Sequence, residues 1–139
     1  MRDLVIKIKK ALQSIEEEKG EFRIKCLVAK DPSNMLWDLI LSAEWFEDDL
    51  MKRLDYLSER ILGDFDIDCM LHFSGIITYT VTSSHPLLEM LRVVQENNRI
   101  GKYSDLGQGY VIVDSHSELA QLIIPLNNSE IPDFIHESL

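Results

Sequence analysis

Cysteine is scarce in this chain, and its two occurrences, Cys26 and Cys69, do not have the spacing of a metal site or a redox pair. Each lies within an apolar or alternating segment, so we expect both to be small buried residues of the core. A chain that uses cysteine in this way fits a reducing compartment. The sequence therefore predicts a cytoplasmic protein without disulfides.

Long apolar runs are also missing. Residues 1–10 interleave charged residues with apolar ones, which excludes the unbroken apolar stretch of a secretory signal. No segment is long enough to span a bilayer, which needs about 20 apolar residues. We therefore expect no membrane partner.

Basic residues are few beyond the first 30 positions. Residues 1–30 hold eight Lys/Arg against five Asp/Glu, whereas residues 31–139 hold six against nineteen, and the whole chain has a net charge of -10. Nucleic acids and anionic membranes are bound by basic faces, so this balance argues against both. A basic or neutral protein partner is electrostatically easier. The other explanation of the acidity is solubility alone.

A length of 139 residues with 45% hydrophobic residues suits one domain with a substantial core. Periodicity predicts helices over 3–19, 50–62 and from Pro86 to about Asn97, and strands over 22–28, 36–43, 70–82, 110–113 and 119–124. The first two strands form a predicted antiparallel hairpin around the turn at 31–34.

These elements predict an α+β fold in the order α-β-β-α-β-α-β-β, with a mixed or mostly antiparallel five-stranded sheet and about three helices. Residues 1–125 are the predicted globular domain. Residues 126–139 are a tail, expected to be loosely held unless Ile131, Phe134 and Ile135 dock on the body or on another copy.

Asp64, Asp66 and Asp68 have the opening spacing of a calcium-binding loop. The rest of that motif fails, because Cys69 stands where the loop needs glycine and Gly75 stands where it needs a bidentate glutamate. The alternation of these aspartates with apolar residues indicates a half-buried edge segment instead. No metal site is predicted.

Two further segments resemble fragments of chemical motifs. Asp114, Ser115 and His116 have the residue types of a catalytic triad, but immediate neighbours point in different directions, and a hairpin turn explains them better. The glycines of residues 107–109 precede a strand and open no helix, so no phosphate site or nucleotide cofactor is predicted. The other histidines lack metal-ligand spacing: His72, His85 and His136.

The junction between the second predicted strand and the second predicted helix is the best candidate site. Glu44, Trp45, Phe46 and Glu47 follow the strand directly, where clefts are common. Trp37 is expected in the core because it alternates in phase with its apolar neighbours on the strand. Trp45 could anchor a partner or ligand, or it could fold over the edge of the core as a hydrophobic staple.

Two functions remain open from the sequence. The favoured one is a non-catalytic protein-interaction or regulatory module that self-associates as a homodimer and offers acidic and aromatic surface to a protein partner. The alternative is a small-molecule-binding domain or modest hydrolase with a cleft near Trp45, in which Glu44 or Glu47 acts with a histidine from elsewhere. No catalytic residue or cofactor is assigned, which favours a non-enzyme.

Overall fold

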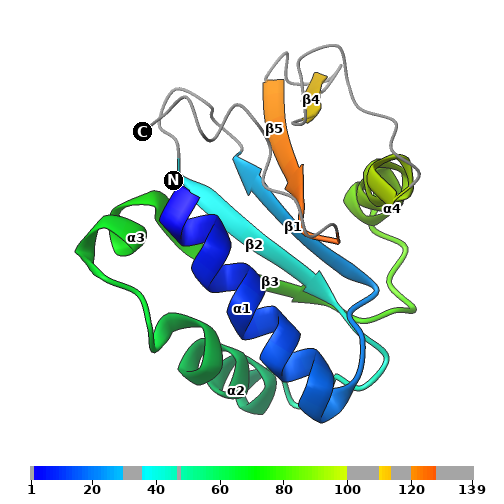
Figure 1. Ribbon diagram of the computed structural model, residues 1–139. Coiled ribbons are helices and arrows are strands. Elements are labelled where there is room, and N and C mark those ends of the chain that lie inside the picture. The colour runs from blue at the N-terminus through cyan, green and yellow to red at the C-terminus, as the bar shows by residue number, and fades with distance from the viewer. Residues whose placement is uncertain (1, 30–35, 47, 100–109, 114–119, 128–139) are drawn as a thin grey trace.

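The computed structural model describes residues 2–29, 36–46, 48–99, 110–113 and 120–127, and side chains over 3–29, 36–46, 48–96 and 123–127 (Figure 1). In chain order, the elements are α1 (Arg2–Lys19), β1 (Ile24–Ala29), β2 (Trp37–Ser42), α2 (Leu50–Leu62), α3 (Ile67–His72), β3 (Phe73–Tyr79), α4 (Pro86–Arg99), β4 (Tyr110–Val113) and β5 (Ala120–Pro125). The predicted α+β class is confirmed.

The strands form one mixed sheet in the order β3-β2-β1-β5-β4. β1 pairs antiparallel with β2, as the predicted hairpin requires, and also antiparallel with β5. β3 returns parallel to β2. The turn predicted at 31–34 lies outside the described residues.

The predicted order and element count are wrong in detail. The described residues form four helices instead of about three, because the Asp66 carboxylate caps the added helix α3 by accepting the Cys69 N–H. The third strand is correspondingly shorter than predicted and starts at Phe73. The part of the sheet that has described side chains is four-stranded, β3-β2-β1-β5. The short β4 adds paired backbone at the edge beside β5.

Helix α1 forms where apolar residues recur every three or four positions, and residues such as Ile8 and Leu12 are almost fully buried. The helix ends at Gly20, whose φ of 120° lies in the left-handed region that glycine adopts readily, and the Gly20 N–H closes the last turn on the Glu16 carbonyl at 3.0 Å. A Cβ at Gly20 would also lie only 3.3 Å from the Trp45 ring. Glycine is therefore required there for two reasons.

Helix α2 begins and ends where the sequence predicted, but its first turn is buried differently from what the pattern indicates. Asp49 caps its first turn. Leu50 is 49% exposed although it is apolar, while Arg53 joins Leu57 and Ile61 on the buried face. The guanidinium has polar and aromatic contacts inside, so an arginine takes the position that simple patterning would give to an apolar residue.

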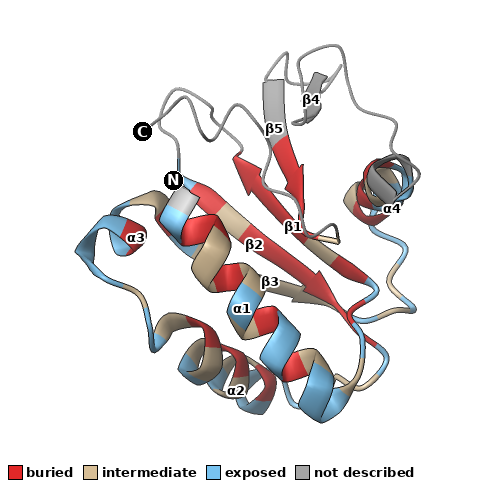
Figure 2. Cartoon of the chain, viewed as in Figure 1, coloured by how far each residue is buried: buried red, intermediate tan, exposed pale blue. Residues whose placement is uncertain are grey.

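The core lies on both faces of the sheet (Figure 2). Alternate residues of β1 separate the two sides: Leu27 packs with α1, α2 and α3, whereas Cys26 and Val28 pack with α4. Trp37 is fully buried on the α1 side, as expected. The central strands β1 and β2 are thus covered on both faces, whereas all β3 residues from Gly75 to Tyr79 are only half-buried.

Candidate functional site

The Trp45 side chain packs against the end of α1. Its Nε1–H donates to the Gly20 carbonyl at 2.9 Å. Its ring makes edge contacts with Phe22, Phe46 and Tyr56 at centroid distances of 5.4, 4.9 and 6.3 Å. These contacts are those of the staple that the sequence left as the alternative, since both the ring and its polar atom are occupied within the chain.

Of the other predicted site residues, Phe46 stays beside Trp45 and Glu44 does not. Glu44 is exposed and forms an ion pair with Arg23. The Phe46 ring packs edge-on against Trp45 and lies under the Arg53 guanidinium, whose Cζ is 5.2 Å from the Phe46 ring centroid. Glu47 lies outside the described residues. A hollow of about 600 Å³ adjoins Trp45 and Glu44, and no histidine lies among the described residues that line it.

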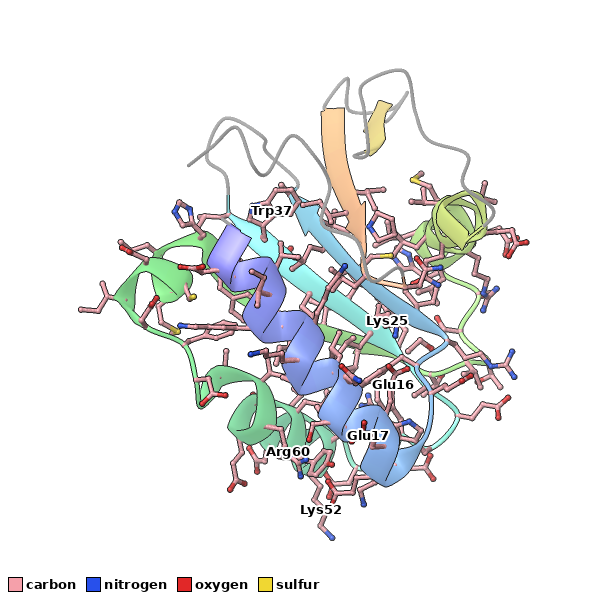
Figure 3. All side chains as sticks on the ribbon, in the orientation of Figure 1. Glu16, Glu17, Lys25, Trp37, Lys52 and Arg60 are labelled. Carbon is pink, nitrogen blue, oxygen red and sulfur yellow. The ribbon has the colours of Figure 1, made fainter. Side chains whose placement is uncertain are left out.

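A larger groove of about 900 Å³ was not foreseen from the sequence. It lies between the end of α1, the beginning of β1 and α4. Lys25 Nζ meets Glu16 Oε1 at 2.8 Å on its floor, and both side chains are about four-fifths buried. The second Glu16 oxygen accepts the Phe22 N–H at 3.0 Å. Figure 3 shows Glu16 and Lys25 pointing toward one another, with Glu17 beside them on α1.

Gln95 of α4 forms the far wall of this groove. Its Oε1 accepts the Lys25 N–H at 2.7 Å, and its Nε2 donates to the Arg23 carbonyl at 2.9 Å. β5 has ended here, because its last pair with β1 joins Cys26 to Pro125 and the Leu126 N–H then bonds the Lys25 carbonyl at 2.9 Å. The Gln95 amide therefore continues the ladder of hydrogen bonds where the neighbouring strand stops.

The two cysteines show no sign of reactivity. Burial raises the pKa of the Cys26 thiol, and its sulfur donates weakly to Gln95 Oε1 at 3.4 Å. Burial also raises the pKa of Cys69, which is the buried residue of α3 and is 2% exposed. A thiol must be exposed and readily ionised to act as a nucleophile, so both serve as core residues, as expected.

A polar cluster ties α1 to α2. Glu18 accepts hydrogen bonds from the Tyr56 hydroxyl at 2.8 Å and from Arg60, and these two bonds lower its pKa. Burial and the bond to Glu18 raise the pKa of Tyr56. Arg60 also donates to Ser14. The groups satisfy one another, so we assign the cluster to helix packing.

The three aspartates with calcium-loop spacing do not converge. Asp66 caps α3 and bonds Lys7 at 3.2 Å, and the bonds from Cys69 and Lys7 lower its pKa to about 2. Asp64 and Asp68 are exposed. Over the described part of the chain, no three His, Cys, Asp or Glu side chains gather closely enough to hold a metal ion.

His85 has a structural partner. Its Nδ1 accepts the Leu87 N–H at 3.1 Å at the start of α4, and its ring lies 5.3 Å from that of Tyr79. His72 ends α3. The segments 107–109 and 114–116, and His136, lie outside the described residues.

Helix α3 presents apolar side chains to solvent. Ile67, Met70 and Leu71 are 78%, 51% and 64% exposed, and Cys69 is its buried residue. We call these three exposed residues the α3 patch. The sequence did not predict this patch, because the alternation around the aspartates indicated a half-buried edge segment, in which Ile67 would face inward.

Comparison of the chain with protein-family models, with curated proteins and with solved structures finds no match. Among the described residues, no helix is both long enough and apolar enough to cross a membrane.

Proposed function

We propose that this chain is a non-catalytic protein-interaction module of the cytoplasm, which docks a protein partner on the α3 patch and also self-associates. The observation that carries the docking proposal is the exposure of Ile67, Met70 and Leu71 on one short helix. Isolated exposed apolar residues are ordinary, but three on a six-residue helix make a cluster of the kind that partners cover.

The charges around the α3 patch favour a basic partner. Asp64 and Asp68 are exposed beside the patch, and the chain as a whole carries a net charge of -10. A partner segment with apolar residues flanked by Lys or Arg complements both features. The buried cysteines support a reducing compartment, because neither of them forms a disulfide.

Selection from a random peptide library tests this proposal. The wild type is compared with a variant carrying Ile67→Ser and Leu71→Ser, and with a control carrying Leu50→Ser and Met51→Ser at exposed positions of α2. We expect enriched peptides with basic and apolar residues that bind the wild type and the control alike and bind the patch variant roughly tenfold more weakly, since lost apolar contacts at an interface centre cost about 1.4 kcal/mol or more.

Circular dichroism establishes that both variants fold, which we expect because the substituted residues are exposed. Enriched peptides that bind the patch variant as tightly as the wild type would remove the α3 patch from the proposal.

The alternative of a small-molecule site or hydrolase near Trp45 is less favoured. It needs a histidine beside Glu44, and the described lining of that hollow contains none. Trp45 is also occupied by Gly20 and by its ring contacts.

A further inference from the structure

The outer edge of β3 is uncharged in a strongly acidic chain. The strand runs Phe73–Tyr79 with the sequence FSGIITY, which holds no charged residue and no proline. Natural proteins protect edge strands with charged residues, especially lysine, and with proline, because an unprotected edge pairs with other strands. β3 is the end of the sheet order, and no described strand pairs with its outer side.

The edge is regular over most of its length. The register with β2 shifts once, between Trp37 and Asp38, and five consecutive pairs follow, from Asp38 with Gly75 to Ser42 with Tyr79. A strand bound on one side by such a ladder directs its remaining backbone N–H and C=O groups outward, ready for a second strand.

The side chains of β3 extend apolar surface on both faces. Ile76 lies against the α1 side of the core, while Ile77 and Tyr79 lie against the α4 side, and all three are only half-buried. A further strand along this edge would cover the exposed part of each of these side chains, on both faces of the sheet.

Gly75 gives an independent indication. A Cβ at this position would meet no described atom within 4 Å. Glycine in a strand marks a bulge or the close approach of another backbone, and the register shift beside Gly75 is such an irregularity. The space around Gly75 also leaves room for a second strand.

We propose that β3 pairs antiparallel with β3 of a second copy, across a two-fold axis near the middle of the strand, so that the two sheets become continuous. This inference rests on the self-association part of the proposed function and locates it. A two-fold interface sets each surface against itself, so an edge that pairs with its own copy must be free of opposed like charges. An uncharged edge is the surface that two copies, each of net charge -10, can bring together without opposing like charges.

Single-cysteine scanning tests the pairing. Cysteine is placed in turn at Ser74, Gly75, Ile76 and Ile77, and each variant is oxidised mildly and run on a non-reducing gel. The native cysteines are buried and do not compete. Val93→Cys, at a 54% exposed position of α4, is the control.

Antiparallel two-fold pairing brings only the residue at the axis within disulfide distance of itself. We therefore expect dimer formation to peak at one or two adjacent positions, roughly tenfold above the Val93→Cys control. Equal crosslinking at all positions, or none above the control, would overturn the proposal.

Light scattering of the wild type distinguishes failure of the β3 pairing from failure of self-association itself. A dimer mass that rises with salt, because salt screens the repulsion between two acidic copies, supports the pairing. A dimer whose β3 cysteines do not crosslink keeps self-association and refutes the β3 edge as its site. A monomer at every concentration and salt refutes self-association itself, while docking on the α3 patch is decided separately by the peptide selection.

Discussion

The beginning of β1 and the outer edge of β3 both lack a neighbouring strand among the described residues, but only one of them is satisfied by a side chain. At the beginning of β1, where β5 has ended, the Gln95 amide bonds the Lys25 N–H and the Arg23 carbonyl. Along the outer edge of β3, no described strand or side chain takes this role for Gly75–Tyr79, apart from the Arg53 bond to the Thr78 hydroxyl.

The difference shows which backbone groups are satisfied within the chain and which are left for another chain. A long-range side chain closes the β1 opening inside the chain, so that opening calls for no partner. Among the described residues, no side chain closes the β3 edge in this way. The strand also carries no charged residue that would oppose pairing with a strand of another chain. The contribution of the β1 closure to the free energy of unfolding, and that of the contacts that hold β3, can be measured by substitution.

The largest effect is expected at Gln95. Gln95→Ala removes an acceptor from the Lys25 N–H and a donor from the Arg23 carbonyl, and it leaves both backbone groups without their protein partner. We expect the free energy of unfolding to fall by about 2 kcal/mol, because each group left unsatisfied costs about 1 to 3 kcal/mol and the open groove lets water recover part of it. Urea denaturation measures this change.

A graded series sharpens the test. Gln95→Glu keeps an acceptor for Lys25 but loses the donor to Arg23, so its loss of stability should lie between wild type and Gln95→Ala. Val93→Ala, on an exposed position of the same helix, should change stability by less than about 0.5 kcal/mol. A Gln95→Ala protein as stable as Val93→Ala would show that the β1 opening needs no closure.

Helix ends that are set by neighbouring residues were predicted from the sequence, whereas contacts between residues far apart in the chain were not. Helix α2 was placed correctly because Asp49 and Gly63 mark its ends locally. The Gln95 closure joins residues 70 positions apart, and no periodicity encodes such a bond. Arg53 was missed for the same reason, since its partners Thr78 and Phe46 come from other elements.

Helix α3 shows a different limit. Its sequence alternates polar and apolar residues around Asp64, Asp66 and Asp68, which is the period of a strand. The Asp66 side chain accepts a hydrogen bond from the Cys69 N–H and stabilises the start of a helix instead. In this helix, Ile67 and Leu71 are exposed to solvent. The α3 patch was therefore not predicted, because the sequence there has the period of a strand.

An intermediate effect is expected at Arg53, which fastens β3 to α2. Its Nε–H donates to Thr78 Oγ1 at 3.0 Å, and its guanidinium lies over the Phe46 ring. Arg53→Lys keeps the charge but loses the planar group that makes both contacts, so we expect a loss of about 1 to 2 kcal/mol in urea denaturation. Lys52→Ala, whose side chain projects away from the body in Figure 3, should be nearly neutral.

A double-mutant cycle with Thr78→Val isolates the bond from the rest. Coupling of about 0.5 kcal/mol or more between Arg53→Lys and Thr78→Val would show that the bond itself fastens β3. Additive effects would assign the role of Arg53 to its other contacts, which include the one with the Phe46 ring.

The smallest effect is expected at Asp66, and it depends on pH. Bonds from Cys69 and from Lys7 lower the pKa of Asp66 from 3.8 to about 2 in the folded chain. A carboxylate with a lowered folded pKa stabilises the fold fully above its ordinary pKa, and this contribution is lost as the pH falls through the folded pKa. Asp66→Asn retains a capping oxygen but loses the charge.

Urea midpoints of wild type and Asp66→Asn should therefore differ slightly at neutral pH and converge between pH 3.8 and about 2. Asp64→Asn removes the same charge two positions earlier, outside the cap, and controls for the change in net charge. A pH-independent difference for Asp66→Asn would mean that the cap acts through geometry alone. Convergence would instead make α3, and with it the exposure of the α3 patch, dependent on an ionised Asp66.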